Sequence, residues 1–174
     1  MGDAYIQSKG QILSLEVIVT FSFFLAAILI FIVSWNAIFA TYQQEAALRQ
    51  MQTSLVGISD MLVMSPGDPA DWEVNAMGSA SSFGLATTRG ILSRQKIIAL
   101  QSLNSSYDSM RESMGAGISN LYIEVGTTSG VALYSFGRPF DPSDRDIYSA
   151  SADRLALLDG QLVKVRVQLW RSKR

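Results

Sequence analysis

The sequence predicts an α+β protein in which one long N-terminal helix carries a small head with an antiparallel sheet and short helices. No charged residue occurs between Glu16 and Glu45, and residues 17–40 are almost wholly apolar. From residue 65 onward, turn residues separate short stretches with helical or alternating apolar periodicity. The mean hydropathy of +0.21 is high for a soluble domain, and the apolar excess is concentrated near the N-terminus.

The composition excludes several classes of function. Fourteen basic residues face fifteen acidic ones, so there is no basic excess for binding nucleic acid. Cysteine is absent, which rules out disulfides and thiolate metal sites, and histidine, the commonest general base and metal ligand, is absent too. No nucleophile elbow or phosphate loop occurs. We therefore expect no enzyme, no cofactor and no metal site.

Residues 17–40 form a segment long enough to cross a bilayer, since about 20 apolar helical residues suffice. Trp35, Asn36 and Tyr42 stand where an interfacial belt is expected. A buried core helix is the alternative, but such a length is unusual in so small a domain. A secretory signal peptide has a shorter apolar region of about 7–15 residues, and Ile38 stands where its cleavage site needs a small residue.

The residues before this segment are Lys9-Gly10-Gln11, followed by Ser14 and Glu16. This leader resembles the archaeal class III signal peptide, which is read by a prepilin peptidase. The resemblance implies cleavage between Gly10 and Gln11, loss of residues 1–10 as a leader, and retention of a helix over 11–64. In that family the glutamate is fifth in the mature chain, whereas here it would be sixth. Cleavage after Gln11 would restore the spacing, so two scissile bonds remain open.

Glu16 is a carboxylate at the edge of an apolar helix, a costly position unless the charge is paired. The resemblance to type IV pilins implies a role in filament assembly, in which this carboxylate pairs with the new N-terminal amine of the same or a neighbouring subunit. The alternative is a solvated acid at a membrane boundary.

The helix is expected to continue through Val63 and to stop at the turn Ser65-Pro66-Gly67-Asp68-Pro69. Its second half has one apolar stripe, and residues 65–174 form the head. We expect helices over 90–103, started by Ser93, and over 107–114, closed by Gly115. Strands are expected over 118–125, 131–136, 154–158 and 162–170, the last two joined by Asp159-Gly160.

Four head segments also resemble those of small archaeal pilin-like proteins, as does the terminal strand from Lys164 to Trp170. These segments are Leu62 to Pro69, Asp71-Trp72-Glu73, Phe83-Gly84-Leu85-Ala86 and Ser93-Arg94-Gln95-Lys96. We interpret them as structural, with a turn at the prolines and Trp72 as a core or rim anchor.

Three weaker patterns occur in the head. Asp141, Asp144 and Asp146 suggest a calcium loop, but Pro142, Arg145 and the lack of a following glutamate favour a solvated loop. Gly115-Ala116-Gly117 lacks the third glycine of a dinucleotide loop and fits a helix exit. Asn104-Ser105-Ser106 matches the N-glycosylation pattern, in a region expected to be a loop, although chance matches are common in a serine-rich chain.

Together these patterns predict a structural subunit, with a minor role favoured, of an archaeal type IV pilus-like or pseudopilus filament. Its partners would be prepilin peptidase, sister pilin subunits and the lipid bilayer, with a cytoplasmic N-terminus, a single membrane pass and an extracellular head on a cell-surface filament. The alternative is a single-pass anchored extracellular binding protein that does not polymerise. A membrane-tethered enzyme is a third and less favoured interpretation.

Overall fold

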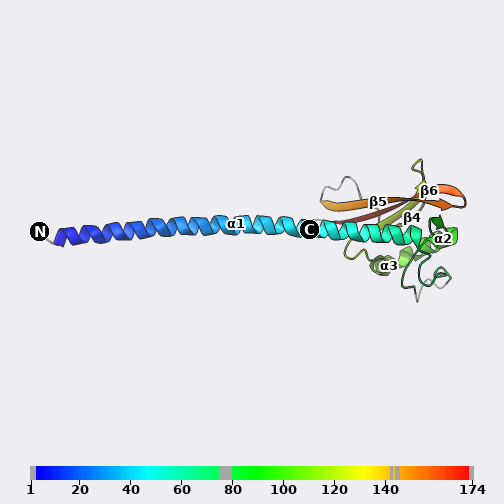
Figure 1. Ribbon diagram of the computed structural model, residues 1–174, viewed down its shortest axis with the longest axis horizontal. Helices are drawn as coiled ribbons and strands as arrows, with labels where there is room; N and C mark the ends of the chain where they lie inside the picture. Colours follow the sequence, from blue (N-terminus) through cyan, green and yellow to red (C-terminus); the bar gives the residue numbers. More distant parts are fainter. Residues whose placement is uncertain (1–2, 75–79, 142, 144–145, 173–174) are drawn as a thin grey trace. The chain divides into compact units, whose positions relative to one another are not determined.

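The computed structural model describes residues 3–74, 80–141, 143 and 146–172. The chain divides into two compact units, Met1–Ala47 and Leu48–Arg174, and each is described by itself. Helix α1 (Asp3–Met64) begins in the first unit and ends in the second. The predicted α+β class is therefore confirmed, with a long apolar helix and a sheet rich in antiparallel pairs (Figure 1).

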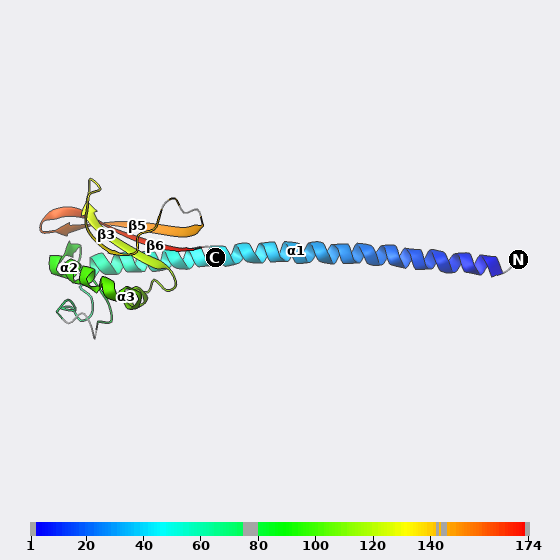
Figure 2. The same ribbon diagram turned by 180° about the vertical axis from the view of Figure 1, so that it is seen from behind.

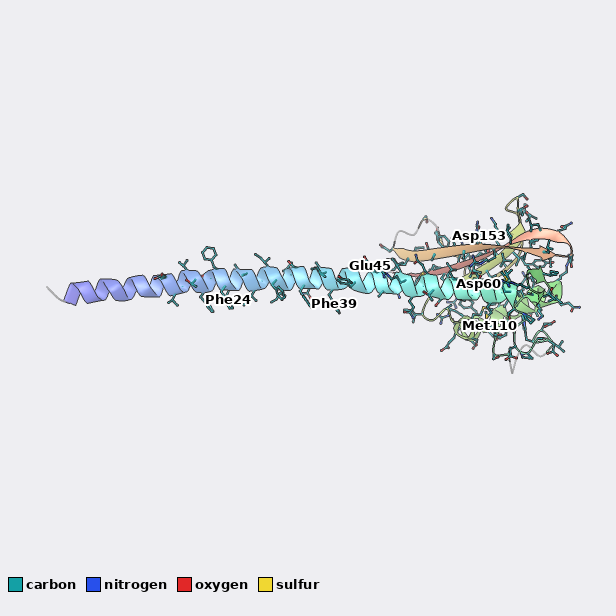
Figure 3. All side chains as sticks on the ribbon, in the orientation of Figure 1. Phe24, Phe39, Glu45, Asp60, Met110 and Asp153 are labelled. Carbon is teal, nitrogen blue, oxygen red and sulfur yellow. The ribbon has the colours of Figure 1, made fainter. Side chains whose placement is uncertain are left out.

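The first unit consists of α1 alone among its described residues. Every residue from Glu16 to Phe39 is exposed, and this stretch is long and apolar enough to cross a membrane. Figure 3 shows Phe24 and Phe39 projecting freely from the helix. A helix whose surface is mostly apolar gains free energy when that surface leaves water, so this segment favours an apolar environment.

The second unit contains one six-stranded sheet with the order β1-β2-β5-β6-β3-β4. Only the β2–β5 pair is parallel, and the other four pairs are antiparallel. The strands are β1 (Ala86–Thr88), β2 (Ile91–Leu92), β3 (Asn120–Thr127), β4 (Ala132–Gly137), β5 (Ile147–Leu158) and β6 (Gln161–Ser172).

The final part of α1 runs between the sheet and the two short helices, as both Figure 1 and Figure 2 show. The predicted apolar stripe is confirmed: Leu48, its first member, is half-buried, and Met51, Leu55, Ile58 and Leu62 are buried. The predicted inner face of the last strand is confirmed as well: Val163, Val165, Val167 and Leu169 are at most 3 % exposed. Alternating residues of β3, Leu121, Ile123 and Val125, complete that face.

The short helices form close to where the sequence places them. Helix α2 (Arg94–Ser102) begins after Ser93, whose Oγ accepts a hydrogen bond from the Lys96 N–H. A 3₁₀ helix, η1 (Leu103–Ser106), leads into α3 (Tyr107–Ser113). Gly115 then adopts a φ of +80°, a conformation that favours glycine and ends the helix.

Two sequence predictions about this region need correction. Residues 90–92 are not helical, because Gly90 lies in a turn and Ile91–Leu92 is strand β2. Strand β5 begins at Ile147 rather than at Arg154. Its first half alternates serine with alanine, which gives no apolar contrast to detect, and β2 is too short to show any periodicity.

Candidate functional site

The residues of the predicted processing site lie within the first turns of α1. Lys9, Gly10 and Gln11 have helical backbones, but their side chains lie outside what the structure describes. A glycine inside a helix costs about 0.5–1 kcal/mol relative to alanine. Local unwinding of α1 is therefore easier around Gly10 than in the apolar stretch that follows.

Glu16 is the acidic residue that opens the apolar stretch, and it is exposed. Val17, Phe21 and Phe24 surround its side of the helix and are 66 %, 58 % and 61 % exposed. No ion pair of Glu16 occurs within the described part of the chain. The carboxylate thus stands beside a wide apolar surface, and no cation among the described side chains neutralises it.

Polar side chains inside the apolar stretch fall into two groups. Ser22 donates to the Ile18 carbonyl at 2.8 Å, and Asn36 donates to the Ile32 carbonyl at 2.9 Å. By contrast, the hydroxyl groups of Thr20 and Ser34 make no hydrogen bond with any residue that the structure describes. Within the helix, the Ser22 hydroxyl and one N–H of the Asn36 amide thus find an acceptor, which lowers the cost of placing them in lipid.

Helix geometry separates these two groups in space. At 3.6 residues per turn, Thr20 and Ser34 lie within about 40° of Glu16 around the helix axis. Ser22 and Asn36 lie about 120° and about 160° away from Glu16 by the same geometry. The polar groups without internal partners therefore share one side of the helix with the carboxylate. We call Glu16, Thr20 and Ser34 the polar stripe.

The other end of the apolar stretch carries aromatic rings. Trp35 stacks on Phe31 with ring centroids 5.9 Å apart, and Tyr42 is 68 % exposed. Rings with one polar atom are favoured at the level of lipid headgroups. The interfacial belt stays a prediction, with Trp35 and Tyr42 both exposed at this end of the stretch.

In the second unit, the four head segments singled out in the sequence meet around the C-terminal end of α1. The carbonyl of Leu62 accepts from the Leu85 N–H at 2.9 Å, and that of Val63 accepts from the Gly90 N–H at 2.9 Å. Ser65 O accepts from the Ala86 N–H at 3.2 Å. We call residues 62–73, 83–90 and 93–96 the helix-end cluster.

Trp72 is the apolar centre of the helix-end cluster and is completely buried. Its indole N–H donates to the Gly84 carbonyl at 2.8 Å, and its ring meets Phe83 edge-on at 5.2 Å. A Cβ at Gly84 would lie 1.9 Å from the Ser65 carbonyl oxygen, so only glycine fits there. The sequence predicts that Trp72 packs either in the core or at its rim, and the structure places it in the core.

Lys96 is the polar centre of the same cluster and is only 4 % exposed. Its Nζ donates to the carbonyl groups of Pro66 and Ala70, the latter at 2.6 Å, and lies 3.7 Å from Glu73 Oε2. One ammonium group thus holds the turn after α1 onto the start of α2. This role was not predicted from the sequence, because the local sequence Ser93-Arg94-Gln95-Lys96 does not distinguish a buried lysine from a solvated one.

On the outer face of the sheet, Asp153 forms a bidentate ion pair with Arg166. The two pairs of atoms, Nε–Oδ1 and Nη2–Oδ2, are 2.9 and 3.1 Å apart. The hydrogen bond from Arg166 holds the pKa of Asp153 below its ordinary value, and Asp153 in turn raises the pKa of Arg166. Nearby, the pKa of Tyr122 is raised, chiefly by burial of its hydroxyl group and secondly by the negative charge of Glu124.

A second ion pair joins the sheet to the helix. Arg154 Nε donates to Asp60 Oδ1 at 2.8 Å, which links β5 to the last part of α1. Figure 3 labels Asp60 on α1 and Asp153 on the sheet, the acidic partners in these two ion pairs.

Among the residues that the structure describes, the weaker sequence candidates do not assemble into a binding site. The Asp141 carboxylate accepts from the N–H and Oγ of Ser143, which lowers the pKa of Asp141. Asp146 is exposed, whereas Asp144 lies outside the described residues. Across the described ranges, no group of three acidic residues is arranged to hold a metal. Gly115 and Gly117, with φ of +80° and +59°, form the predicted helix exit.

Asn104 lies in η1 rather than in the expected loop, and it is exposed. Its Oδ1 accepts a hydrogen bond from the Gly137 N–H at 3.1 Å.

Comparison of the chain with family models, with curated proteins and with solved structures finds no match.

Replacing Lys96 by methionine is expected to lower the free energy of unfolding by about 3–5 kcal/mol, because it leaves buried carbonyl oxygens and the Glu73 carboxylate without their cation. Urea unfolding of the full chain in detergent, followed by tryptophan fluorescence, measures the change. Arg94→Met is the matched control, since the Arg94–Asp159 pair is exposed and is worth at most about 1 kcal/mol. Equal, small losses in the two variants would contradict the role given to Lys96.

Replacing Asp153 by asparagine is expected to lower the free energy of unfolding by about 0.5–1 kcal/mol at pH 7, the range of a well-formed exposed pair. The folded-state pKa of Asp153 is depressed, so its contribution is complete above the unfolded pKa of about 3.9 and is lost as pH falls through the folded pKa. The two unfolding curves should therefore converge in acid. In an Arg166→Met background, where Lys164 Nζ still lies 3.8 Å from Asp153 Oδ2, Asp153→Asn should cost less than it does in the natural chain, and an undiminished loss there would contradict the pairing with Arg166.

Proposed function

We propose that this chain is a structural subunit of an archaeal type IV pilus-like filament, made as a membrane precursor and clipped before its apolar helix. The observation that carries the proposal is the exposed apolar stretch from Glu16 to Phe39, preceded by Lys9-Gly10-Gln11. A plain anchor needs the same stretch, but it has no need of a glutamate at its edge.

The apolar helix serves both states of such a subunit. In the precursor, lipid surrounds the helix; in the filament, sister helices replace the lipid. Because most of the helix surface is apolar, the exchange trades one apolar surface for another. The polar stripe of Glu16, Thr20 and Ser34 favours the second state, since a neighbouring chain supplies hydrogen-bonding and charged partners that lipid tails lack.

The position of the scissile bond decides which amine reaches Glu16. If Gln11 is the first mature residue, its amine and Glu16 are five residues apart, or about 140° around the helix, and they do not face each other. The pair then joins two subunits. If Ile12 is first, the separation is four residues, or about 40°, and the pair can form within one chain. Cleavage after Gly10 therefore gives the carboxylate a direct part in joining subunits.

The arrangement of the second unit suits a subunit that carries no chemistry. Its buried groups are used for packing and for holding the end of α1, and Lys96 and Trp72 are both fully engaged in the helix-end cluster. We therefore propose a head that contributes surface, in a structural subunit of minor rather than major type.

Replacing Gly10 by leucine is expected to abolish processing, because a peptidase site that requires a small residue cannot accept the branched side chain. Mass spectrometry of the intact protein from its native host gives the result directly. The natural chain should begin at Gln11 or Ile12, and the variant at Met1. A natural chain that still begins at Met1 would favour the non-polymerising anchored protein instead, and one that begins beyond Ala40 would reject both interpretations.

Replacing Glu16 by alanine is expected to leave membrane insertion and processing intact but to reduce incorporation into filaments at least tenfold, because the N-terminal amine loses its partner. Filament yield relative to the membrane pool measures the effect. Glu45→Ala is the control, as it removes a carboxylate from the same helix beyond the apolar stretch. Equal filament yields from the two variants would contradict a special role for Glu16.

A further inference from the structure

Asn104 has a structural role that the glycosylation pattern alone does not reveal. Its Oδ1 accepts from the N–H of Gly137 in β4, which is an edge strand of the sheet. Beside it, Gln101 Nε2 donates to the Ser135 carbonyl at 3.2 Å. Two side chains from α2 and η1 therefore occupy backbone groups that an edge strand would otherwise offer to another chain.

This contact also fixes which way the amide points. A backbone N–H can bond only to the oxygen of an asparagine amide, so Oδ1 faces the strand and Nδ2 is left on the other side. The residue is exposed, and Nδ2 makes no hydrogen bond with any residue in the described ranges. The nitrogen is thus the one polar atom of the Asn104 side chain that the fold leaves unused.

Ser106, the third residue of the pattern, is half-buried and makes no side-chain hydrogen bond with any described residue. It stands at the N-cap position of α3, where serine normally bonds a backbone N–H of the first turn, but its side chain makes no capping hydrogen bond. The fold therefore accounts for the oxygen of Asn104 but not for the serine two residues later. Recognition of Asn-x-Ser by a glycosyl-transferring enzyme accounts for both residues.

We propose that Asn104 is a dual-purpose residue: Nδ2 carries an N-linked glycan while Oδ1 continues to bond the edge of β4. The inference rests on the proposed function, because the head must lie outside the cell to meet the transferase. The sugar donor is a lipid-phosphate-linked oligosaccharide. A bond forms between Nδ2 and C1 of the sugar, the bond from C1 to the phosphate oxygen breaks, and the amide proton leaves with the phosphate.

The position gives the glycan a physical consequence. The glycan would lie next to the edge of β4. Asn104 and Gln101 already occupy backbone groups of this strand, and a bulky, hydrated group beside them would also block the approach of another strand sterically. A filament places many copies of this edge close together, so protecting it keeps neighbouring heads from joining through their strands.

The test is the mass of the tryptic peptide 97–111 from the full chain purified from its native host. The natural protein should yield this peptide with added oligosaccharide mass, whereas Asn104→Asp and Ser106→Ala should both yield it unmodified. Asn104→Asp keeps an oxygen for the Gly137 N–H, so folding should be retained. Asn104→Ala removes that oxygen and should lower the folding equilibrium constant by about two- to tenfold relative to Ser106→Ala.

The outcomes separate this inference from the proposed function. An unmodified peptide from a chain that is clipped and enters filaments would overturn the glycan and leave the filament standing. A glycosylated peptide from a chain that keeps Met1 would support the glycan and overturn the clipped filament subunit. Equal stabilities of Asn104→Ala and Ser106→Ala would overturn the edge-binding part.

Discussion

The last carbonyl groups of α1 are deprived of water, and the need to bond them organises much of the second unit. Leu62 and Val63 are buried, so their carbonyl oxygens must find donors within the protein. A glycine cap would meet this need locally in many helices, but here Leu85 and Gly90 provide the donors. The chain must therefore return to the helix end, and this return brings β1 and β2 beside it.

The same requirement explains which residues fill the helix-end cluster. Gly84 passes so close to Ser65 that no side chain fits, and its carbonyl is the acceptor for Trp72. Lys96 donates hydrogen bonds to the carbonyl groups of Pro66 and Ala70 in the turn after α1, which would otherwise lack these partners. One buried cation is tolerated because several oxygens surround it. Burial of apolar surface by Trp72 stabilises the cluster, and hydrogen bonding determines its geometry.

The first unit differs from the second in the exposure of its side chains rather than in the bonding of its backbone groups. All its backbone groups within the apolar stretch are bonded inside the helix, but its side chains from Glu16 to Phe39 are buried by nothing within the unit. Such a stretch is long and apolar enough to cross a membrane. The polar stripe of Glu16, Thr20 and Ser34 interrupts this apolar surface, and its side chains make no hydrogen bond or ion pair with the described residues. The chain thus combines a unit with a buried core and a unit whose side chains from Glu16 to Phe39 are exposed.

Periodicity and composition were sufficient for the helix, its apolar stretch, the inner faces of β3 and β6, and the Asp159-Gly160 turn, because each of these depends on residues close together in the sequence. The start of β5, strands β1 and β2, and the burial of Lys96 could not be predicted in this way. Each depends on a partner distant in the chain: β6 for β5, the parallel contact with Leu157 for β2, and the carbonyl groups of Pro66 and Ala70 for Lys96. The candidate site divides in the same manner. The sequence alone marks Glu16 and the Asn104 pattern, whereas only the tertiary structure brings Asn104 to the edge of β4, because the bond to Gly137 joins two elements that local propensity cannot relate.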